Sequence, residues 1–231
     1  EFRMGDRRYC YPLTVADLHS RFLLGCRGNS STAYDETRPE FEKLFEKYGL
    51  PGKILSDGGT PFSSAHSVRR LSRLSVWWIR LGIEPILIQP GRPDQNGSHE
   101  RMHRTLKAET ARPPEGNLRA QQRRFDCFQK EFNEERPHEA LGMRPPSELY
   151  RCSPRPYPSK LPELTYPGHF EIRRVRPKGE IKWKGQYVFV SEVLARETVG
   201  LEEIDDGIWS LYFGSLLLGR YDQREENLDL L

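Results

Sequence analysis

Two carboxylates at the ends of regular elements constrain this chain more than any other feature. Asp57 directly follows the short apolar run of residues 53–56, which predicts a strand that ends in a turn. Glu100 lies in the opening turns of a predicted helix that follows a loop containing Pro and Gly at residues 90–95. Mg²⁺ is usually held by one or two carboxylates together with phosphate oxygens of a substrate. The pair therefore predicts metal-dependent chemistry on DNA or RNA.

Length and composition favour a folded protein without a membrane segment. The chain has 231 residues, which suits one large domain or a medium domain followed by a small one. An aromatic content of 11% argues against disorder. No apolar run approaches the roughly 20 residues needed to span a membrane, so no membrane partner is expected. The chain starts at Glu1 without Met, and we expect a segment upstream of it.

The four cysteines exclude some functions. None forms a C-x-x-C pair, so zinc ribbons and redox motifs are unsupported. They fit reduced thiols of a cytosolic protein, and we expect them to pack as buried apolar side chains.

Positive charge is concentrated in the first part of the chain. Residues 1–169 hold 27 Lys or Arg and 21 Asp or Glu, whereas residues 170–231 hold 9 and 12. A mildly basic, arginine-rich domain can bind phosphate backbones. For any single arginine, a solvated helix surface is an equally good interpretation.

Strands and helices alternate over the first 150 residues. Period-2 and apolar runs predict strands, and apolar residues at i, i+3, i+4 and i+7 predict helices, with Pro39 in the first turn of one of them. The predicted strands cover residues 9–16, 21–26, 53–56 and 84–89, and the predicted helices cover residues 39–48, 66–81, 96–111 and 118–135. Such an order predicts an α/β domain, a mixed sheet flanked by helices.

The pattern changes after residue 150. Five prolines fall within residues 151–168, which predicts an extended, semi-rigid linker. Beyond it, the period becomes 2 in residues 181–183, 186–190 and 208–213, with glycine-containing turns between them. Short strands and turns over about 60 residues predict a small C-terminal β-barrel.

Three motifs in a fixed order carry a resemblance to a known family. The first is Asp57-Gly-Gly-Thr-Pro-Phe, and the second runs from Pro93 through Asn96, Gly97, Glu100 and Arg101 to Leu106 and Lys107. The third runs from Phe132 through Arg136 and His138 to Leu141, followed by Pro146 and Tyr150. Together they resemble the DDE transposases of bacterial insertion sequences, which are relatives of retroviral integrases. The resemblance implies a ribonuclease H-like catalytic core at residues 1–150, a proline-rich linker at 151–168 and a small β-barrel domain at 169–231.

The resemblance also implies roles for the two carboxylates. Asp57 and Glu100 would be the second and third members of an acidic triad, with 42 residues between them. Gly58 departs from many relatives, which carry Asn there. The first Asp of the triad is expected upstream of Glu1, because Asp17 matches a position that is not a ligand in relatives and Asp6 lies in a predicted turn. We therefore expect this chain to be inactive by itself.

The implied activity is cleavage and strand transfer of transposon DNA ends. Two Mg²⁺ ions (or Mn²⁺) would activate the nucleophile and stabilise the leaving oxygen of an in-line displacement. The resemblance further implies DNA as the partner, a homo-oligomer assembled on that DNA, and a bacterial cytoplasmic, nucleoid-associated location.

The residues around Glu100 are candidates for DNA contact. Asn96 suits the N-cap of the helix, and Glu100, His103 or Arg104, and Lys107 share one helix face. With Arg101, these cations could contact DNA phosphate. On spacing alone, a surface ladder of ion pairs and a plain turn Asp at position 57 are sufficient interpretations.

Two other functions stay open. The chain could be a catalytically inactive DNA-binding or scaffolding relative of transposases, which Gly58 and the missing first Asp favour. It could also be a ribonuclease H-type nuclease without strand transfer. Trp77, Trp78 and His138 are expected to have structural roles.

Overall fold

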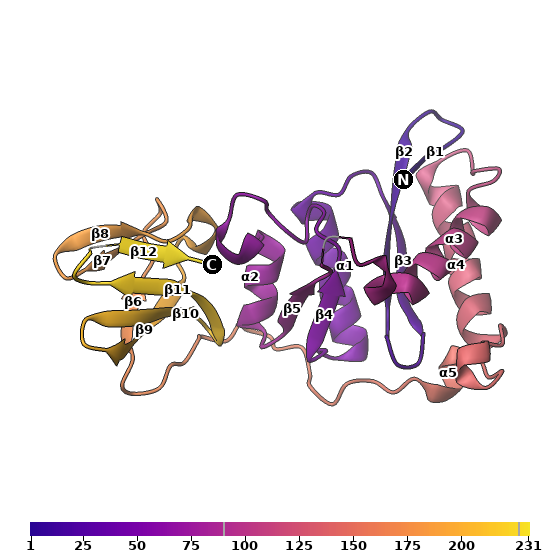
Figure 1. The fold of residues 1–231 in the computed structure, drawn as a ribbon. Coiled ribbons are helices and arrows are strands. Elements are labelled where there is room, and N and C mark those ends of the chain that lie inside the picture. The colour runs from indigo at the N-terminus through magenta and orange to yellow at the C-terminus, as the bar shows by residue number, and fades with distance from the viewer. Residues whose placement is uncertain (90, 226) are drawn as a thin grey trace. The chain divides into compact units, whose positions relative to one another are not determined.

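The computed structural model describes residues 1–89, 91–225 and 227–231, and it divides into two compact units (Figure 1). Unit 1 consists of Glu1–Pro51 and Ile88–Tyr157, and unit 2 consists of Gly52–Leu87 and Pro158–Leu231. Each unit is thus assembled from two segments of the chain. The boundary between two domains near residue 168, which the sequence indicates, stays a prediction.

Unit 1 is built on the antiparallel sheet β1-β2-β3, whose middle strand is the longest. Its elements are β1 (Phe2–Arg3), β2 (Tyr9–Ala16), β3 (Leu23–Asn29), α1 (Tyr34–Tyr48), η2 (Pro93–Asn96), α3 (Gly97–Thr110), α4 (Leu118–Glu134), η3 (Glu139–Leu141) and α5 (Pro146–Leu149). The predicted bounds of β2 are confirmed, and those of α3 and α4 are right to within one residue. Pro90, with which the predicted loop begins, lies outside the described residues.

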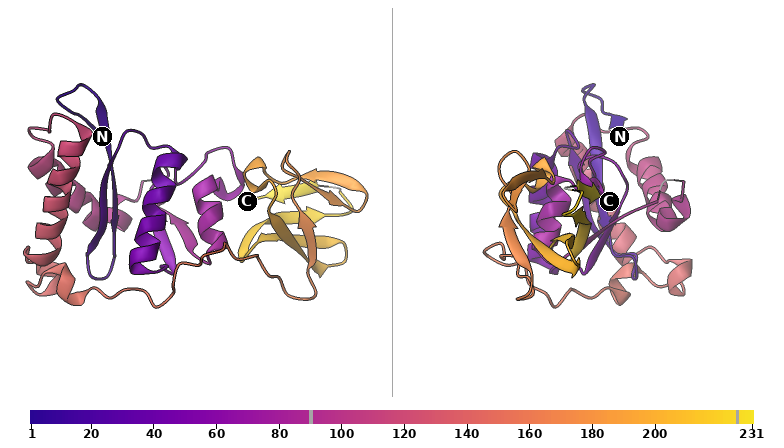
Figure 2. Two further views of the ribbon diagram at one scale, coloured as in Figure 1. Left: turned by 180° about the vertical axis from the view of Figure 1, so that it is seen from behind. Right: turned by 60° about the vertical axis from the view of Figure 1, so that its left-hand side comes forward.

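Helices cover both faces of β3. Side chains three positions apart in a strand point to opposite faces, so Gly25 and Gly28 face different helices. A Cβ on Gly25 would lie 3.1 Å from Leu44 Cδ1 of α1, and one on Gly28 would lie 3.1 Å from Leu118 Cδ1 of α4. The sheet therefore lies between α1 and α4, as both views of Figure 2 show.

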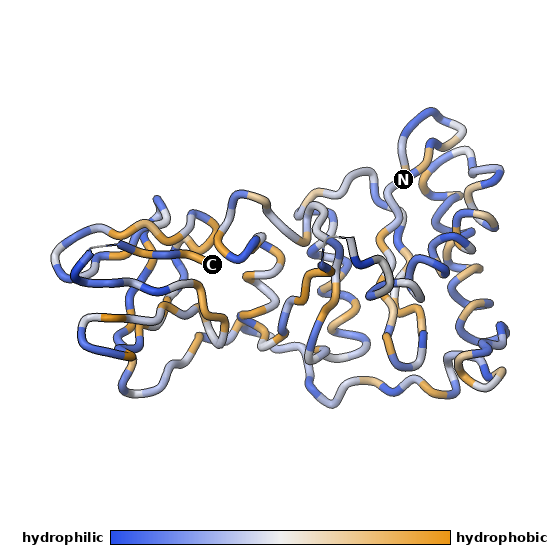
Figure 3. The backbone as a smooth tube through the Cα atoms, viewed as in Figure 1, coloured by the Kyte–Doolittle hydropathy of each residue, from blue (hydrophilic) through white to orange (hydrophobic). Residues whose placement is uncertain are grey.

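The core of unit 1 forms where α3 and α4 meet the sheet. Met102 and Leu106, four residues apart on α3, are buried, and the apolar stripe of α4 packs beside them. The hydrophobic cluster contains Met4, Cys10, Leu23, Cys26, Met102, Leu106, Phe125, Phe128 and Phe132. Figure 3 shows that the rest of α3 and α4 is mostly hydrophilic. Both helices are therefore amphipathic, as predicted.

The expectation that all four cysteines are buried was wrong. Cys10 and Cys26 are buried, and burial raises the pKa of both thiols. Cys127 and Cys152 are exposed. Cys127 is two positions from Phe125 on α4, which places it away from the apolar stripe. All four are free thiols in the structure.

Unit 2 combines a parallel strand pair with an antiparallel sheet of order β12-β11-β10-β9-β6 and a separate hairpin β7-β8. Its elements are β4 (Lys53–Ser56), η1 (Val68–Arg70), α2 (Arg73–Arg80), β5 (Glu84–Leu87), β6 (Glu171–Arg174), β7 (Glu180–Trp183), β8 (Gln186–Phe189), η4 (Glu192–Leu194), β9 (Thr198–Asp205), β10 (Ile208–Phe213), β11 (Leu216–Asp222) and β12 (Asn227–Leu230). A mixed sheet combines antiparallel and parallel strand pairs. Both kinds of pair are present before residue 150, but the antiparallel strands β1, β2 and β3 and the parallel pair β4-β5 form separate sheets. Over the residues described, the C-terminal strands form an open sheet and a hairpin, and no closed barrel is found.

One hydrophobic core joins α2 to the C-terminal sheet. Val76 and Ile79 of α2 lie in the same buried cluster as Trp183, Trp209 and Phe213. Arg80 donates a hydrogen bond from Nη1 to Glu197 Oε2 at 2.7 Å, and its Nη2 donates to the Pro162 carbonyl at 2.6 Å. Trp77 and Trp78 are 4% and 0% exposed, so the structural role expected for them is confirmed.

Two predicted helices differ in their bounds. α1 begins at Tyr34 and not at Pro39, because the Glu36 carboxylate binds the backbone and hydroxyl groups of Ser30 and Ser31 and extends the helix by a turn. α2 is shorter than predicted. Arg69 and Arg70 have positive φ angles of 52° and 54°, which end the preceding turn, and Ser72 and Ser75 then form a capping box at the start of α2. None of the described helices has the length and apolarity that crossing a membrane requires.

Candidate active site

Asp57 lies at the turn that leaves β4 in unit 2. Its side chain is exposed, and Oδ1 accepts a hydrogen bond from the Gly59 backbone N–H at 3.0 Å. A Cβ at Gly58 would lie 2.7 Å from Arg70 Nη2, so glycine at this position lets the Arg70 guanidinium come close. The Asp57 carboxylate therefore shapes its own turn and also faces solvent.

Glu100 lies in the first turn of α3 in unit 1, where a negative charge is favoured by the helix dipole. Its side chain is exposed, and it makes no hydrogen bond or ion pair with any residue that the structure describes. Both carboxylate oxygens are therefore available to a ligand. Because Asp57 and Glu100 belong to different units, their separation stays a prediction.

The predicted DNA-contacting cations follow Glu100 along the exposed side of α3. Arg101, Arg104 and Lys107 are all exposed. Asn96 occupies the N-cap position as predicted, but its side chain accepts no hydrogen bond from the first turn. The cap is therefore weaker than the sequence predicted.

His103 does not join the exposed cations. Its Nε2 lies 2.6 Å from Thr14 Oγ1 on β2, and His99 Nε2 lies 3.0 Å from the same oxygen. One hydroxyl can donate to one ring and accept from the other when the rings are neutral. Burial lowers the pKa of His103 to about 4, and His99 and Lys107 contribute to the decrease. His103 is therefore neutral near pH 7 and holds α3 against β2.

A second contact holds the first turn of α3. Arg21 Nη1 donates to Ser98 Oγ at 2.7 Å, two residues before Glu100. Arg21 follows a turn in which Asp17 Oδ2 accepts hydrogen bonds from the Ser20 N–H and hydroxyl at 2.7 and 2.6 Å. The sequence pointed to this turn, since Asp17, Ser20 and Arg21 match a D-x-x-S-R arrangement of the transposases that the chain resembles. It gave no indication that Arg21 reaches α3.

Two acidic residues near the N-terminus stabilise turns. Asp17 is bound by Ser20, and Asp6 Oδ1 accepts a hydrogen bond from the Arg8 N–H at 3.0 Å. Which residue is the first acidic member of a triad stays a prediction.

The donor set at Asp57 and Glu100 fits Mg²⁺ in its chemistry. Both are exposed carboxylates, and hard oxygen ligands of this kind are those that Mg²⁺ takes, with substrate phosphates and water completing the coordination. Within the described residues, no group of three or more His, Cys, Asp or Glu side chains is arranged to hold a metal ion.

His138 has the structural role expected for it. Its ring lies 4.7 Å from that of Phe132, and a hydrogen bond links it to the Phe132 backbone at the end of α4. Burial lowers the pKa of His138.

Family models match both parts of the chain. The integrase core domain matches residues 81–146, a range that contains Glu100 and the whole of α3. The C-terminal domain of the IS481 family transposases matches residues 170–229.

Curated relatives come from bacteria and from retroviruses. The putative transposase InsD for insertion element IS2E of Escherichia coli (strain K12) is 30% identical over 127 residues, which is 53% of this chain and 55% of that protein. The Gag-Pol polyprotein of baboon endogenous virus (strain M7) is 34% identical over 99 residues, which is 43% of this chain and 5% of that protein. The chain therefore spans about half or less of the length of these relatives.

Solved structures show more distant similarity. The catalytic core domain of BIV integrase has a TM-score of 0.48 at 20% identity, covering 65% of this chain and 90% of that chain. A chain of the simian T-cell lymphotropic virus intasome, in complex with the PP2A regulatory subunit B56 gamma, has a TM-score of 0.48 at 14% identity and covers 94% of this chain and 80% of its own.

The sequence matches define a class and then a narrower group. Residues 81–146 match the integrase core domain, and the curated relatives include a bacterial transposase. Residues 170–229 match the narrower C-terminal domain of the IS481 family transposases. The resemblance to bacterial insertion-sequence transposases is thus confirmed.

Proposed function

We propose that this chain forms the catalytic core and C-terminal module of a DNA transposase that cleaves transposon ends and joins them to target DNA. The observation that carries the proposal is Glu100, a carboxylate that is exposed, unpaired among the described residues and within the matched integrase core domain. Three exposed cations, Arg101, Arg104 and Lys107, follow it on the same helix. A free carboxylate beside cations is suited to hold metal against a phosphate backbone.

Asp57 and Glu100 would act as ligands of Mg²⁺ or Mn²⁺, with two ions in the site. The ions would supply charge stabilisation for the attacking and leaving oxygens. The chain's own residues position the substrate: Lys107 and Arg104 bind backbone phosphates, while Thr14 and Arg21 hold the helix that carries Glu100.

Several further properties belong to the same proposal. The core has a ribonuclease H-like arrangement, and the C-terminal sheet and hairpin form a separate module of the protein. The protein acts as a homo-oligomer on DNA in the bacterial cytoplasm, associated with the nucleoid. These properties rest on the resemblance to transposases.

Cleavage and joining assays with the complete reading frame test the proposal. Glu100→Gln keeps the shape of the side chain and removes its charge, so we expect it to abolish both steps and to leave DNA binding nearly intact. Glu134→Gln, an exposed carboxylate on α4, is the matched control and is expected to keep wild-type rates. Undiminished cleavage by Glu100→Gln would refute the catalytic assignment.

A second candidate function is a DNA-binding scaffold without catalysis. The hydrogen bond between Asp57 and Gly59, which engages one carboxylate oxygen in the turn, favours it. Failure of the complete protein to cleave or join any DNA that it binds would support the scaffold. A nuclease without strand transfer would cleave but would not join a 3′-hydroxyl donor.

A further inference from the structure

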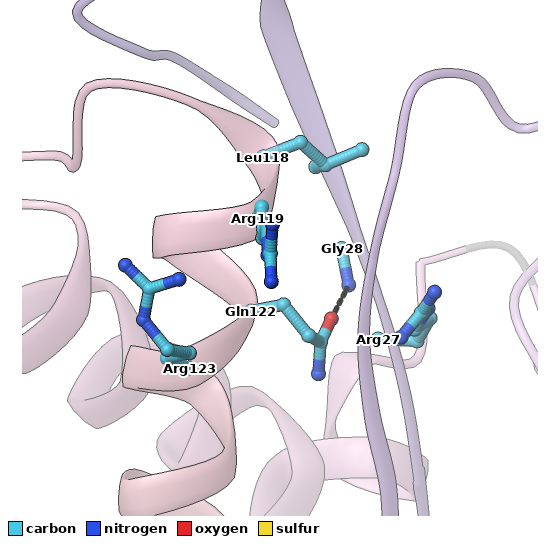
Figure 4. A pocket seen from close by; sticks show the side chains of 6 residues that line it. All are labelled: Arg27, Gly28, Leu118, Arg119, Gln122 and Arg123. Atoms are coloured by element: carbon cyan, nitrogen blue, oxygen red, sulfur yellow. Dashed lines mark hydrogen bonds between the residues drawn. The ribbon is translucent and has the colours of Figure 1, made fainter.

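A surface hollow bordered by three arginines lies on unit 1, between the first turns of α4 and the end of β3. Its volume is about 440 Å³, and it is lined by Arg27, Gly28, Leu118, Arg119, Gln122 and Arg123. Figure 4 shows one arginine coming from the strand side and two from the helix. We call this feature the arginine hollow. None of its residues belongs to the candidate active site.

The floor of the arginine hollow is closely packed. A Cβ on Gly28 would lie 3.2 Å from Cys10 Sγ and 3.3 Å from Phe125 Cε2, so a larger residue here would require these neighbours to shift. Gln122 Oε1 accepts a hydrogen bond from the Gly28 N–H at 2.8 Å (Figure 4), and its Nε2 donates to the Cys26 carbonyl at 2.9 Å. The floor therefore presents a fixed surface to a ligand.

The positive charges beside the arginine hollow repel one another. Arg119 and Arg123 are four residues apart on one helix, a spacing at which like charges destabilise it. Arg119 also lies in the first turn of α4, which contains no acidic residue and where a cation is disfavoured. Neither side chain makes a hydrogen bond or ion pair with any part of the chain that the structure describes, and both are exposed.

The third arginine is only partly neutralised. Arg27 Nε lies 3.6 Å from Glu40 Oε1, but the same oxygen is 2.8 Å from Lys43 Nζ. No carboxylate lines the hollow. An anionic ligand would offset the repulsion between Arg119 and Arg123 on α4.

We propose that the arginine hollow binds the phosphodiester backbone of DNA, at a contact separate from the candidate active site. The proposal rests on the proposed function for its choice of DNA. A guanidinium group matches a phosphate in shape and can donate two parallel hydrogen bonds to it. The single amide of the hollow, Gln122, is already bonded to the protein, since Nε2 also donates to Asp126 Oδ1 at 2.7 Å. The contact therefore holds the backbone and does not read bases.

Salt-dependent DNA binding tests this inference. Fluorescence anisotropy with two duplexes of unrelated sequence, at several NaCl concentrations, compares the wild-type chain with the double variant Arg119→Ala/Arg123→Ala. Each lost phosphate contact reduces the slope of log K against log [salt] by about 0.9, so we expect a reduction of about 2 and a loss of affinity on the order of tenfold or more at 0.1 M salt. Both duplexes should lose affinity equally.

The matched control is Arg144→Ala/Arg151→Ala. These arginines are exposed, lie in the same unit on either side of α5 in the sequence, and donate to nearby carbonyl groups. The control removes the same charge and should keep nearly the wild-type slope. Circular dichroism verifies that both variants are folded.

Each outcome is decisive. If the wild type binds DNA and Arg119→Ala/Arg123→Ala keeps its slope, the arginine hollow is not a DNA site and the proposed function is unaffected. Equal losses in both double variants would mean that net charge alone is responsible, which also overturns the inference. If the wild type binds neither duplex at low salt, the choice of DNA fails together with the inference.

Discussion

Lowering the pH should destabilise unit 1 through His103. Burial lowers the pKa of this histidine to about 4, whereas an unperturbed histidine has a pKa of about 6.5. The unfolded chain therefore binds more protons than the folded chain between these values. The contribution to the free energy of unfolding is complete above pH 6.5 and is lost as the pH falls toward 4.

The size of the effect follows from the two pKa values. With these values, His103 alone should reduce the free energy of unfolding by about 2 kcal/mol between pH 8 and pH 5. His103→Gln cannot titrate, so its loss of stability between the two pH values should be smaller by the same amount. The variant should also be less stable than wild type at pH 8, by about 1 kcal/mol, because the hydrogen bond to Thr14 is altered.

Urea unfolding at pH 8 and pH 5 measures these quantities. All four tryptophans, at positions 77, 78, 183 and 209, lie in unit 2, so circular dichroism at 222 nm is used to follow the helices of unit 1. His19→Gln, at an exposed histidine of the same unit, is the matched control and should keep the wild-type pH dependence. If His103→Gln loses as much stability as wild type on acidification, the assignment of a neutral, buried His103 is wrong.

Two further predictions concern packing in each unit. Gly28→Ala should destabilise unit 1 by about 1–3 kcal/mol, because the new methyl group would lie within 3.3 Å of three side chains; a variant as stable as wild type in urea unfolding would contradict this packing. In unit 2, a double-mutant cycle of Arg80→Ala and Glu197→Ala should give a coupling energy of about 1–2 kcal/mol, since the pair is 2.7 Å apart and largely shielded from solvent. Tryptophan fluorescence measures that cycle, and a coupling energy near zero would show that the ion pair contributes nothing.

Local sequence patterns predicted the helices and strands better than they predicted which of these elements pack against each other. The apolar stripe of Phe125, Phe128 and Phe132 predicted α4 because it records which side of the helix is buried. The apolar residues of α2 were predicted to be buried, but nothing in their spacing showed that Val76 and Ile79 pack with the C-terminal sheet. Burial is a local signal, whereas the choice of partner depends on the whole chain.

The candidate site shows the same limit. The motif identified Glu100 and Lys107, and both are exposed on α3 as a ligand-binding role requires. Spacing alone left His103 and Arg104 equivalent, since residues at i+3 and i+4 share a helix face with i. Only the position of Thr14 on β2 separates them, and it directs His103 inward.

The central proposal is that Asp57 and Glu100 both act as metal ligands in a DNA transposase. Oxidative cleavage of the backbone by Fe²⁺ bound in place of Mg²⁺, in the complete protein with DNA, tests this claim directly because only segments next to the ion are cut. We predict cuts both near Asp57 and near Glu100, and the loss of both in Glu100→Gln. Cuts at only one of the two segments, or an unchanged pattern in Glu100→Gln, would contradict the claim.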